Sequence, residues 1–206
     1  MTAPHDASGV HTVIGVDAGT ASLREADHLV HDLMARLGLP PGTLACTHLV
    51  RTDERRGTAV SLALPDAGPA AEVWRRIAGL EMPGLGAALG ALVYGPAPAA
   101  RSAARVATEH AGREGGRAVV FPGAEHLTGT VTVADLLDRT AVERLTVIGA
   151  PASPDGPDPA TPVLTRDHVR PEWQRGRLTL ALVPAAGGAL APFEVPNPTP
   201  CCADHA

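Results

Sequence analysis

Hydrophobic and polar positions at the start of the chain predict a strand followed by a helix. Residues 11–17 form a short apolar run rich in β-branched residues, which favours a strand. Residues 22–37 then repeat apolar side chains at helical spacing. Ser22 and Glu25 have the spacing of a capping box, and Gly38 follows the last apolar position. The sequence therefore predicts a well-capped helix with one buried face.

The next part of the chain predicts a hairpin and two more helices. Two β-rich runs, 44–52 and 58–64, are separated by a short polar loop and favour a hairpin. Helical spacing continues from residue 68 to about 83 and again over 99–110. Between these helices, residues 84–100 consist of Gly, Ala, Leu and Pro with almost no charge. We expect this segment to form a buried or ligand-facing loop and helix.

The remaining pattern is mainly that of strands. Residues 117–121 and 143–149 are apolar runs that predict strands, whereas 131–137 fits a strand or a helix equally well. Further β-like runs cover 163–165, 177–183 and 190–195.

Together these elements indicate an α/β or α+β protein with a mixed sheet and helices packed on it. The predicted organisation is a disordered N-terminus at 1–10, an α/β body at 11–149, a Pro-rich linker at 150–162, a β segment at 163–195 and a Pro-spaced tail at 196–206. The β segment has about thirty residues, too few to bury a core of its own. We therefore expect it to pack on the body in a single compact domain.

Composition limits the classes of partner. The chain has 206 residues, a net charge of −5 and no lysine, since all 17 basic residues are arginine. Without a basic run, nucleic acid is not an expected partner. No apolar stretch is long enough for a membrane span, and the first residues lack the pattern of a signal peptide. We expect a cytoplasmic protein with reduced cysteines. The bias toward Ala, Gly, Pro and Arg is typical of GC-rich coding, as in many bacteria.

The C-terminal tail carries the most distinctive chemistry of the sequence. Cys201, Cys202 and His205 lie within five residues, and Asp204 stands beside the histidine. Two thiolates and an imidazole favour zinc or copper(I) over magnesium or calcium, which take oxygen ligands. We expect Asp204 to orient the imidazole. A fourth ligand would come from elsewhere in the fold, or the site stays open. Three alternating prolines precede the tail as a stiff spacer.

One enzyme family has a tail similar to these vicinal cysteines, and two interpretations without a metal ion stay open. The ending Cys201-Cys202-Ala203 resembles the tail of mercuric reductases, which passes a thiophilic metal ion inward to the active site. The resemblance covers three residues, and the chain lacks the length and the flavin fingerprint of that family. Neighbouring cysteines also form a strained, easily reduced disulfide, which would make them a redox switch or carrier. Alternatively, the two thiols are buried packing under a docked C-terminus. Cys46, in a predicted strand, is expected in the core.

Two loop clusters are candidates for a small-molecule site. His126 follows a Pro-Gly turn, and Asp167, His168 and Arg170 follow the predicted linker. Loops often carry binding residues, but neither cluster has a spacing that specifies a reaction. An apolar segment beside convergent polar groups is the usual composition of a ligand pocket. We therefore expect His126 and His168 to line one cleft with residues 84–95.

The turn after the first predicted strand resembles a phosphate-binding motif. The sequence Asp17-Ala18-Gly19-Thr20 is similar to the opening of the sugar-kinase and actin superfamily, whose turn leads into a second strand. Here Ser22 begins a helix instead, and the chain is about half the length of that two-lobed fold. The interpretation favoured here is an ordinary connection between strand and helix, whose N–H groups could hold an anion.

Two functions from different classes follow. The first is a thiol-dependent metal-binding or redox-active protein that uses the Cys-Cys-Ala-Asp-His tail. The second is a non-catalytic small-molecule-binding or assembly protein, with its C-terminal extension docked on a partner or a neighbouring subunit of a homo-oligomer. A hydrolase of the Ser-His-Asp type is not favoured, because no Gly-x-Ser-x-Gly motif occurs. The sequence does not decide whether the protein is an enzyme.

Metal analysis of protein purified under reducing conditions tests the first function. We expect bound zinc or copper(I), with an affinity that falls as the pH drops, because the ligands must be deprotonated to bind. Replacing Cys201 and Cys202 together by serine should abolish binding and leave thermal stability nearly unchanged. Unfolding of this variant would identify the thiols as structural packing. Protein that neither carries nor binds metal on titration would leave the redox or docking alternatives.

Overall fold

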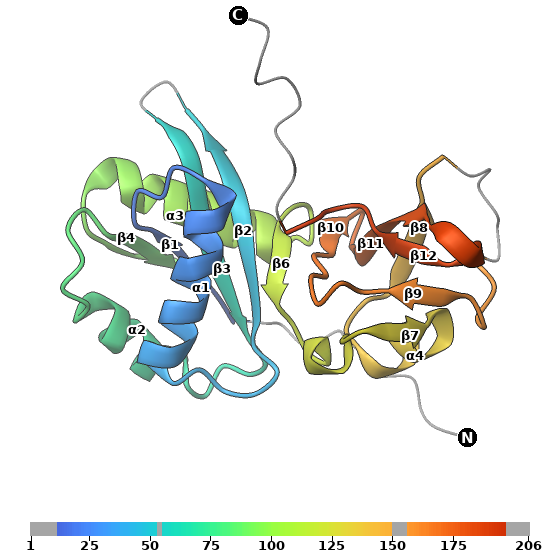
Figure 1. Ribbon diagram of the computed structural model, residues 1–206. Helices are drawn as coiled ribbons and strands as arrows, with labels where there is room; N and C mark the ends of the chain where they lie inside the picture. The colour runs from blue at the N-terminus through green and yellow to red at the C-terminus, as the bar shows by residue number, and fades with distance from the viewer. Residues whose placement is uncertain (1–11, 53–54, 150–155, 197–206) are drawn as a thin grey trace, which may run out of the picture. The chain divides into compact units, whose positions relative to one another are not determined.

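The computed structural model describes residues 12–52, 55–149 and 156–196 (Figure 1). The predicted class is confirmed, because twelve strands of the described residues pair in a mixed pattern and helices pack on them. The chain divides into two compact units. Of the described residues, the first unit contains those up to Pro122 together with Glu172–Arg177, and the second contains all the others.

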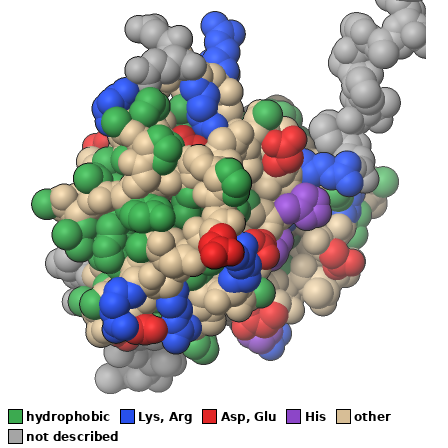
Figure 2. All heavy atoms as spheres, turned by 90° about the vertical axis from the view of Figure 1, so that its left-hand side faces the viewer, with side chains coloured by type: hydrophobic (Ala, Val, Ile, Leu, Met, Phe, Trp, Pro, Cys, Tyr) green, Lys and Arg blue, Asp and Glu red, His purple; other side chains and the backbone are tan. Residues whose placement is uncertain are grey.

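The first unit is built on an antiparallel sheet. Four of its strands, in the order β4-β1-β3-β2, form a split β-α-β arrangement in which the hairpin strand β3 lies between β1 and β2. Figure 2 views this unit from the side on which β4 lies in Figure 1, and hydrophobic side chains gather in a patch there. In pairing order the strands are β5 (Leu92–Tyr94), β4 (Gly86–Leu89), β1 (Thr12–Asp17), β3 (Arg56–Leu64), β2 (Leu44–Arg51), β6 (Arg117–Val120) and β10 (Glu172–Gln174).

Helices cover both faces of this sheet, as Figure 1 shows. Helices α1 (Leu23–Leu37) and α2 (Ala70–Ala78) lie on one face and share its main apolar core with Ile14 and Val16 of β1. Helix α3 (Ala97–Ala111) lies on the other face, where Ala107 packs with Val13. The period-two alternation of β1 therefore places successive side chains in two different cores.

The expected capping box of α1 is present. The side chain of Ser22 accepts a hydrogen bond from the backbone N of Glu25 at 3.2 Å, and the carboxylate of Glu25 accepts one from the backbone N of Ala21 at 2.7 Å. Gly38 ends the helix in the left-handed conformation, at φ 54°. Two N–H groups at this helix start, those of Ala21 and Glu25, are therefore occupied by side chains of the same turn.

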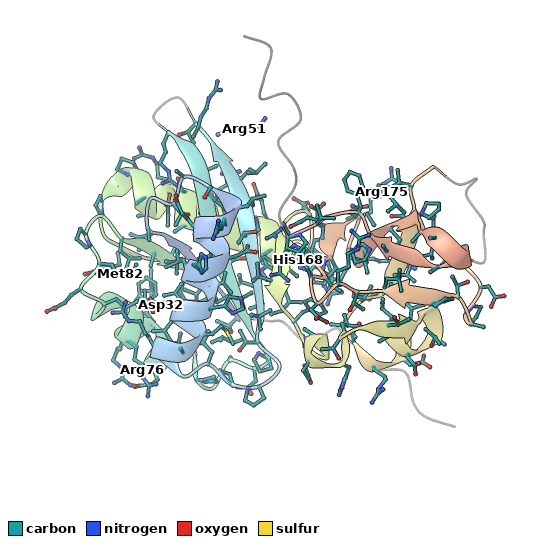
Figure 3. All side chains as sticks on the ribbon, in the orientation of Figure 1. Asp32, Arg51, Arg76, Met82, His168 and Arg175 are labelled. Carbon is teal, nitrogen blue, oxygen red and sulfur yellow. The ribbon has the colours of Figure 1, made fainter. Side chains whose placement is uncertain are left out.

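Helix α2 is joined to the end of α1 by one arginine. Arg76, labelled in Figure 3, donates from Nη1 to the carbonyl oxygen of Leu37 at 2.9 Å. Its Nε donates to the Glu72 carboxylate at 2.9 Å. The guanidinium thus satisfies a terminal carbonyl of α1 that has no partner within the helix.

Helix α3 lies unusually close to the sheet because glycines face it. A Cβ built on Gly15 of β1 would be 1.8 Å from the carbonyl oxygen of Ala103, and one on Gly86 of β4 would be 2.3 Å from the carbonyl carbon of Ala99. No side chain can occupy either position without moving the helix. The buried side chains of α3 are correspondingly small, and they include those of Ala100, Ala103 and Ala107.

The second unit contains a smaller mixed sheet. Strand β11 pairs in parallel with β8 and antiparallel with β12, and β9 pairs in parallel with β12 and antiparallel with β7. The described elements of this unit are η1 (Ala124–His126), β7 (Thr130–Thr132), α4 (Val133–Arg139), β8 (Arg144–Val147), β9 (Pro162–Leu164), β11 (Arg177–Pro184), η2 (Ala186–Gly188) and β12 (Leu190–Pro192).

Two segments differ from the sequence-based expectations. The uncharged segment 84–100 was expected to form a loop and helix, but its first half forms the hairpin β4–β5, which turns through Gly90 at φ 55°. Alanine and glycine in β4 hide the alternation typical of a strand. The ambiguous segment 131–137 divides between β7 and the start of α4, where the Thr132 side chain caps the helix by accepting from the backbone N of Asp135.

None of the helices in the described ranges is long and apolar enough to cross a lipid bilayer.

The close contact between α3 and β1 predicts the effect of one methyl group. Replacing Gly15 by alanine should lower the free energy of unfolding by about 3 kcal/mol, because the new Cβ overlaps the helix backbone and overpacking alone costs about 1–3 kcal/mol. Gly79→Ala is the matched control, since its Cβ would be 3.5 Å from the nearest atoms. We expect that control to change stability by less than about 0.5 kcal/mol. Urea denaturation of both variants measures the difference, and equal stabilities would contradict the packing.

Candidate functional site

A pocket of about 420 Å³ opens in the first unit where β1 ends and α3 begins. This volume is within the range of small-molecule sites, about 300–1,000 Å³. The loop after β1 and the first two turns of α3 form its walls. The lining residues are Asp17, Gly19, Thr52, Arg55, Gly84, Pro96, Pro98, Ala99, Arg101, Ser102 and Arg105.

Asp17 is the buried acid of this pocket. It is the last residue of β1 and is 1% exposed. Its Oδ1 accepts from Nη2 of Arg55 at 2.8 Å and from the backbone N of Gly19 at 2.9 Å. Its Oδ2 has no hydrogen-bond partner among the described residues, and neither has Nε of Arg55. Asp17 is buried whereas Arg55 is partly exposed, and a buried polar atom without a partner is costly unless another group completes it.

Two glycines allow the loop to hold this pair. Gly19 adopts φ 79°, which turns its N–H toward the Asp17 carboxylate. A Cβ on Gly57 would be 2.5 Å from the carbonyl oxygen of Thr20. That oxygen accepts from the backbone N of Thr58 at 2.9 Å. The loop is therefore fixed against the start of β3, the strand that immediately follows Arg55.

The charged residues that line the pocket are mostly cationic. Three arginines, Arg55, Arg101 and Arg105, stand against the single acid Asp17, whereas the whole chain is acidic with a net charge of −5. The Nη1 of Arg105 contacts the Glu109 carboxylate at 2.5 Å, and its Nη2 donates to the carbonyl oxygen of Leu49 at 3.0 Å. Guanidinium groups bind carboxylates and phosphates through paired N–H donors. This wall favours an anion.

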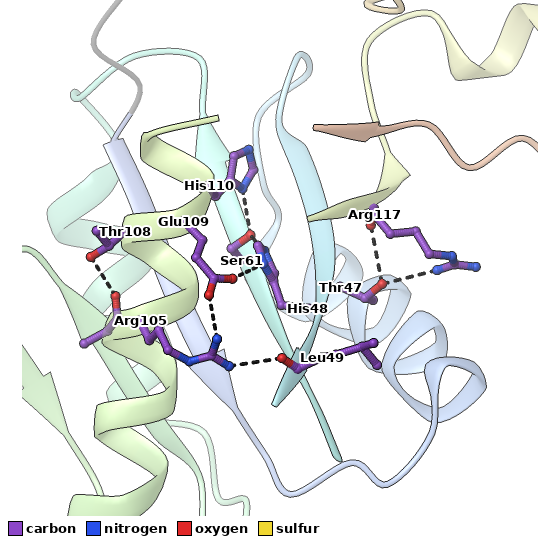
Figure 4. A network of polar contacts seen from close by, with 10 residues as sticks. Thr47, His48, Leu49, Ser61, Arg105, Thr108, Glu109, His110 and Arg117 are labelled. Carbon is purple, nitrogen blue, oxygen red and sulfur yellow. Dashed lines mark hydrogen bonds and ion pairs between the residues drawn. The ribbon is translucent and has the colours of Figure 1, made fainter. Parts of the chain in front are cut away.

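A second group of polar residues lies buried between α3 and the sheet, as shown in Figure 4. The Ser61 hydroxyl in β3 is 2.7 Å from Nε2 of His48 in β2 and 2.7 Å from Nδ1 of His110 in α3. The Nδ1 of His48 is 3.2 Å from the Glu109 carboxylate. A serine hydroxyl carries one proton, so it donates to one imidazole and accepts from the other.

The atoms of Glu109, His48 and Ser61 are connected as in an acid-His-Ser triad. Ser61 is 0% exposed, however, and His48 and His110 are 4% and 3% exposed. A substrate carbonyl therefore has no route to the hydroxyl in this conformation. The hydroxyl is also shared by two imidazoles, whereas a triad nucleophile serves a single base. We interpret the cluster as a buried network whose polar atoms satisfy one another, which is what burial requires of them.

A tryptophan and a glycine enclose this network. The ring of Trp173 in β10 lies 6.2 Å from that of His110, and the Arg113 guanidinium lies 5.0 Å from the Trp173 ring centroid. Gly116, at φ 118°, leaves room for His48, since a Cβ there would be 2.7 Å from the imidazole. Beside it, Cys46 is buried as expected, and burial raises the pKa of its thiol.

The opposite face of β2 carries a separate ion pair. Arg117 of β6 contacts both carboxylate oxygens of Asp27 in α1, at 2.6 and 3.1 Å, and its Nη1 donates to the Thr47 hydroxyl at 3.2 Å. Arg117 is 8% exposed. This bidentate contact ties α1 to the sheet and is structural in character.

The loop residues proposed from the sequence all belong to the second unit. The His168 Nε2 lies 3.0 Å from the Glu194 carboxylate, and Asp167 accepts from the backbone N of Gly129 at 2.9 Å. Arg170 donates to the carbonyl oxygen of Val169, and His126 lies 3.8 Å from the neighbouring Glu125 carboxylate. At Asp167 and His168 these contacts hold the loop to its own unit. The common cleft with residues 84–95 joins different units and stays a prediction.

The predicted metal ligands Cys201, Cys202 and His205, with Asp204, lie outside the described residues. Within 12–52, 55–149 and 156–196, no group of three or more His, Cys, Asp or Glu side chains is arranged to hold a metal ion. Zinc or copper(I) binding by the tail stays a prediction.

Comparison with known protein families, with curated proteins and with solved structures gives no match. Inference about function therefore rests on the site geometry.

Sequence reasoning found one part of the pocket and missed the rest. It identified the turn after Asp17 as a possible anion site, but the N–H of Gly19 is bonded to Asp17 and that of Ala21 to Glu25. Arg101 and Arg105 share the i, i+4 spacing of α3, but Arg55 comes from a hairpin loop, and no local pattern connects it with them. The buried network had a weaker signal, since His48 and Ser61 are polar residues inside strand-like apolar runs.

The network predicts a pH-dependent stability difference for Glu109→Gln. The hydrogen bond from His48, together with the nearby Arg105, lowers the pKa of Glu109 below its ordinary value despite partial burial. A lowered folded-state pKa stabilises the fold above the pKa of the unfolded state, and this contribution is lost as the pH falls through the folded-state pKa. We expect the glutamine variant to be less stable above the ordinary glutamate pKa, with a difference that shrinks as the pH falls through the lowered folded-state pKa of Glu109.

Urea unfolding of both proteins across this pH range measures the difference. Glu114→Gln, an exposed acid just beyond α3, is the control and should follow the wild type throughout. If the lower stability of Glu109→Gln stays the same down to the lowest pH at which both proteins are folded, the shape of the side chain, and not its charge, matters at this position.

Proposed function

We propose that the first unit binds a small organic oxyanion in the pocket between Asp17 and the start of α3. The observation that supports this function most directly is the charge of the pocket lining, in which three arginines stand against one acid. Asp17 is almost completely buried, its Oδ2 has no partner among the described residues, and the same is true of Nε of Arg55. Both atoms are closed to solvent in this conformation, so a ligand that bonds to them requires a movement that exposes them.

The charged side chains of the pocket indicate the class of ligand. Arg55 and Arg101 suit a carboxylate or phosphate, and Asp17 suits a hydroxyl or amino group on the same molecule. A hydroxycarboxylate or a polyol phosphate has both features. The pocket volume of about 420 Å³ limits the ligand to a small molecule.

Ligand binding without catalysis is the function that the contacts around the pocket support. The buried Ser61 hydroxyl is enclosed in its own network, and Arg105 is held by Glu109 and the Leu49 carbonyl. These fixed contacts preorganise the pocket wall, which lowers the entropic cost of binding. We therefore assign ligand recognition, without a bond-making step, to the pocket.

An NMR titration tests the proposal. Citrate, inorganic phosphate and glycerol 3-phosphate are added to ¹⁵N-labelled protein, with glycerol as the uncharged control. We expect at least one anion to shift the backbone amides of Gly19, Arg55 and Arg101 in a saturable manner, and glycerol to shift none of them. Saturable shifts confined to other residues, or no shifts with any of the three anions, would reject the proposed site.

Paired variants then test the charges. Arg101→Gln should weaken anion binding about tenfold or more, because a hydrogen bond to a charged group contributes about 1.5–3 kcal/mol. Arg36→Gln, at an exposed arginine in the last turn of α1 that does not line the pocket, removes the same charge and should leave the affinity unchanged. Asp17→Asn should weaken glycerol 3-phosphate more than inorganic phosphate. Equal losses for both arginine variants would indicate nonspecific attraction.

A further inference from the structure

Strand β5 is an exposed edge of the first unit's sheet. It pairs with β4 through Leu92↔Leu89, Val93↔Ala88 and Tyr94↔Ala87, and it stands last in the strand order of the described residues. On its outer side, the backbone groups of β5 have no neighbouring strand within the described part of the chain. Such an edge offers a template for another strand.

The side chains of this edge are apolar and open to solvent. Leu92, Val93 and Tyr94 are 53%, 64% and 39% exposed. Figure 2 shows hydrophobic side chains gathered in a patch on the side of the molecule that carries β4. A second hollow, of about 380 Å³, is lined by Ala88, Leu89 and Gly90 of the same hairpin and by residues of α3. The apolar surface thus continues from the edge onto a neighbouring face.

Charge is absent from this part of the sequence. From residue 82 to residue 100 there is no Asp, Glu, Arg or His, although 19% of the whole chain is charged. Proteins that keep a sheet edge unpaired usually place charged residues, prolines or bulges on it. β5 has no charge, proline or bulge, and its register with β4 is regular. Its length of three residues limits the exposed backbone, so the three apolar side chains are the main feature that a partner would cover.

We propose that a second copy of this chain covers β5 by antiparallel pairing of the two β5 strands about a two-fold axis. With Val93 at the axis, Leu92 of each strand faces Tyr94 of the other, so that apolar side chains meet apolar side chains. Two copies with a net charge of −5 each repel one another, and an uncharged surface is where their contact costs least. A two-fold contact also pairs identical backbone edges in a closed dimer.

Sedimentation velocity over a range of protein concentrations tests this interface. We expect the wild type to sediment as a dimer. Val93→Lys should raise the dimer dissociation constant at least tenfold, because it places two like charges together at the axis. Leu49→Lys is the matched control, since Leu49 is a 55% exposed leucine on β2, and it should dimerise as the wild type does.

Hydrogen exchange locates the contact independently of the variants. The amides of residues 92–94 should exchange more slowly in the dimer than in Val93→Lys, whose circular dichroism should match the wild type. A monomeric wild type, or a dimer unaffected by Val93→Lys, would overturn the proposal. A dimer weakened equally by both lysine variants would also overturn it, because the effect would then reflect net charge and not the β5 edge.

Discussion

The close approach of α3 to the sheet is the constraint on which both polar sites of the first unit depend. Gly15 and Gly86 remove the side chains that would separate the helix backbone from β1 and β4. With the helix at that depth, residues of its first turns line the pocket and its last turn brings Glu109 and His110 to the strands. Arg105 belongs to both sites, because it lines the pocket and contacts the Glu109 carboxylate. Helix α3 and the Arg105 guanidinium thus connect the pocket with the buried network.

The two faces of this sheet use different means of stabilisation. The face under α1 and α2 is a continuous apolar core with the Asp27–Arg117 ion pair near its margin. The face under α3 has smaller apolar clusters, and Ser61, His48 and His110 occupy buried space between them. Burying such groups is unfavourable unless they bond to each other, and here each does. Hydrogen bonds have directions that apolar contacts lack, so this face defines the position of α3 more strictly than packing of alanine could.

Local patterns were sufficient to predict most elements of the first unit. The period of apolar residues and the capping box defined α1, and the β-rich runs gave β2 and β3. Prediction failed for β4 and β5, because Gly and Ala show no alternation and the sheet buries β4 on both faces. The candidate site was harder still. Asp17 and Arg105 are 88 positions apart in the numbering of the chain and meet only because α3 crosses the sheet, which no local pattern encodes.

The uncharged stretch from residue 82 to 100 shows why such a segment resists interpretation. Its small residues serve three different needs, since Gly86 admits α3, Pro96 and Pro98 form the pocket rim, and β5 presents an apolar edge. Each of these roles excludes charged or bulky side chains for a different physical reason. Together they leave a segment of small, uncharged residues with no recognisable pattern. The strand β4 connects all three, because it pairs with β5, contacts α3 and lies beside β1 and its terminal Asp17. A displacement of β4 would therefore alter the depth of α3, the shape of the pocket and the exposed edge at the same time.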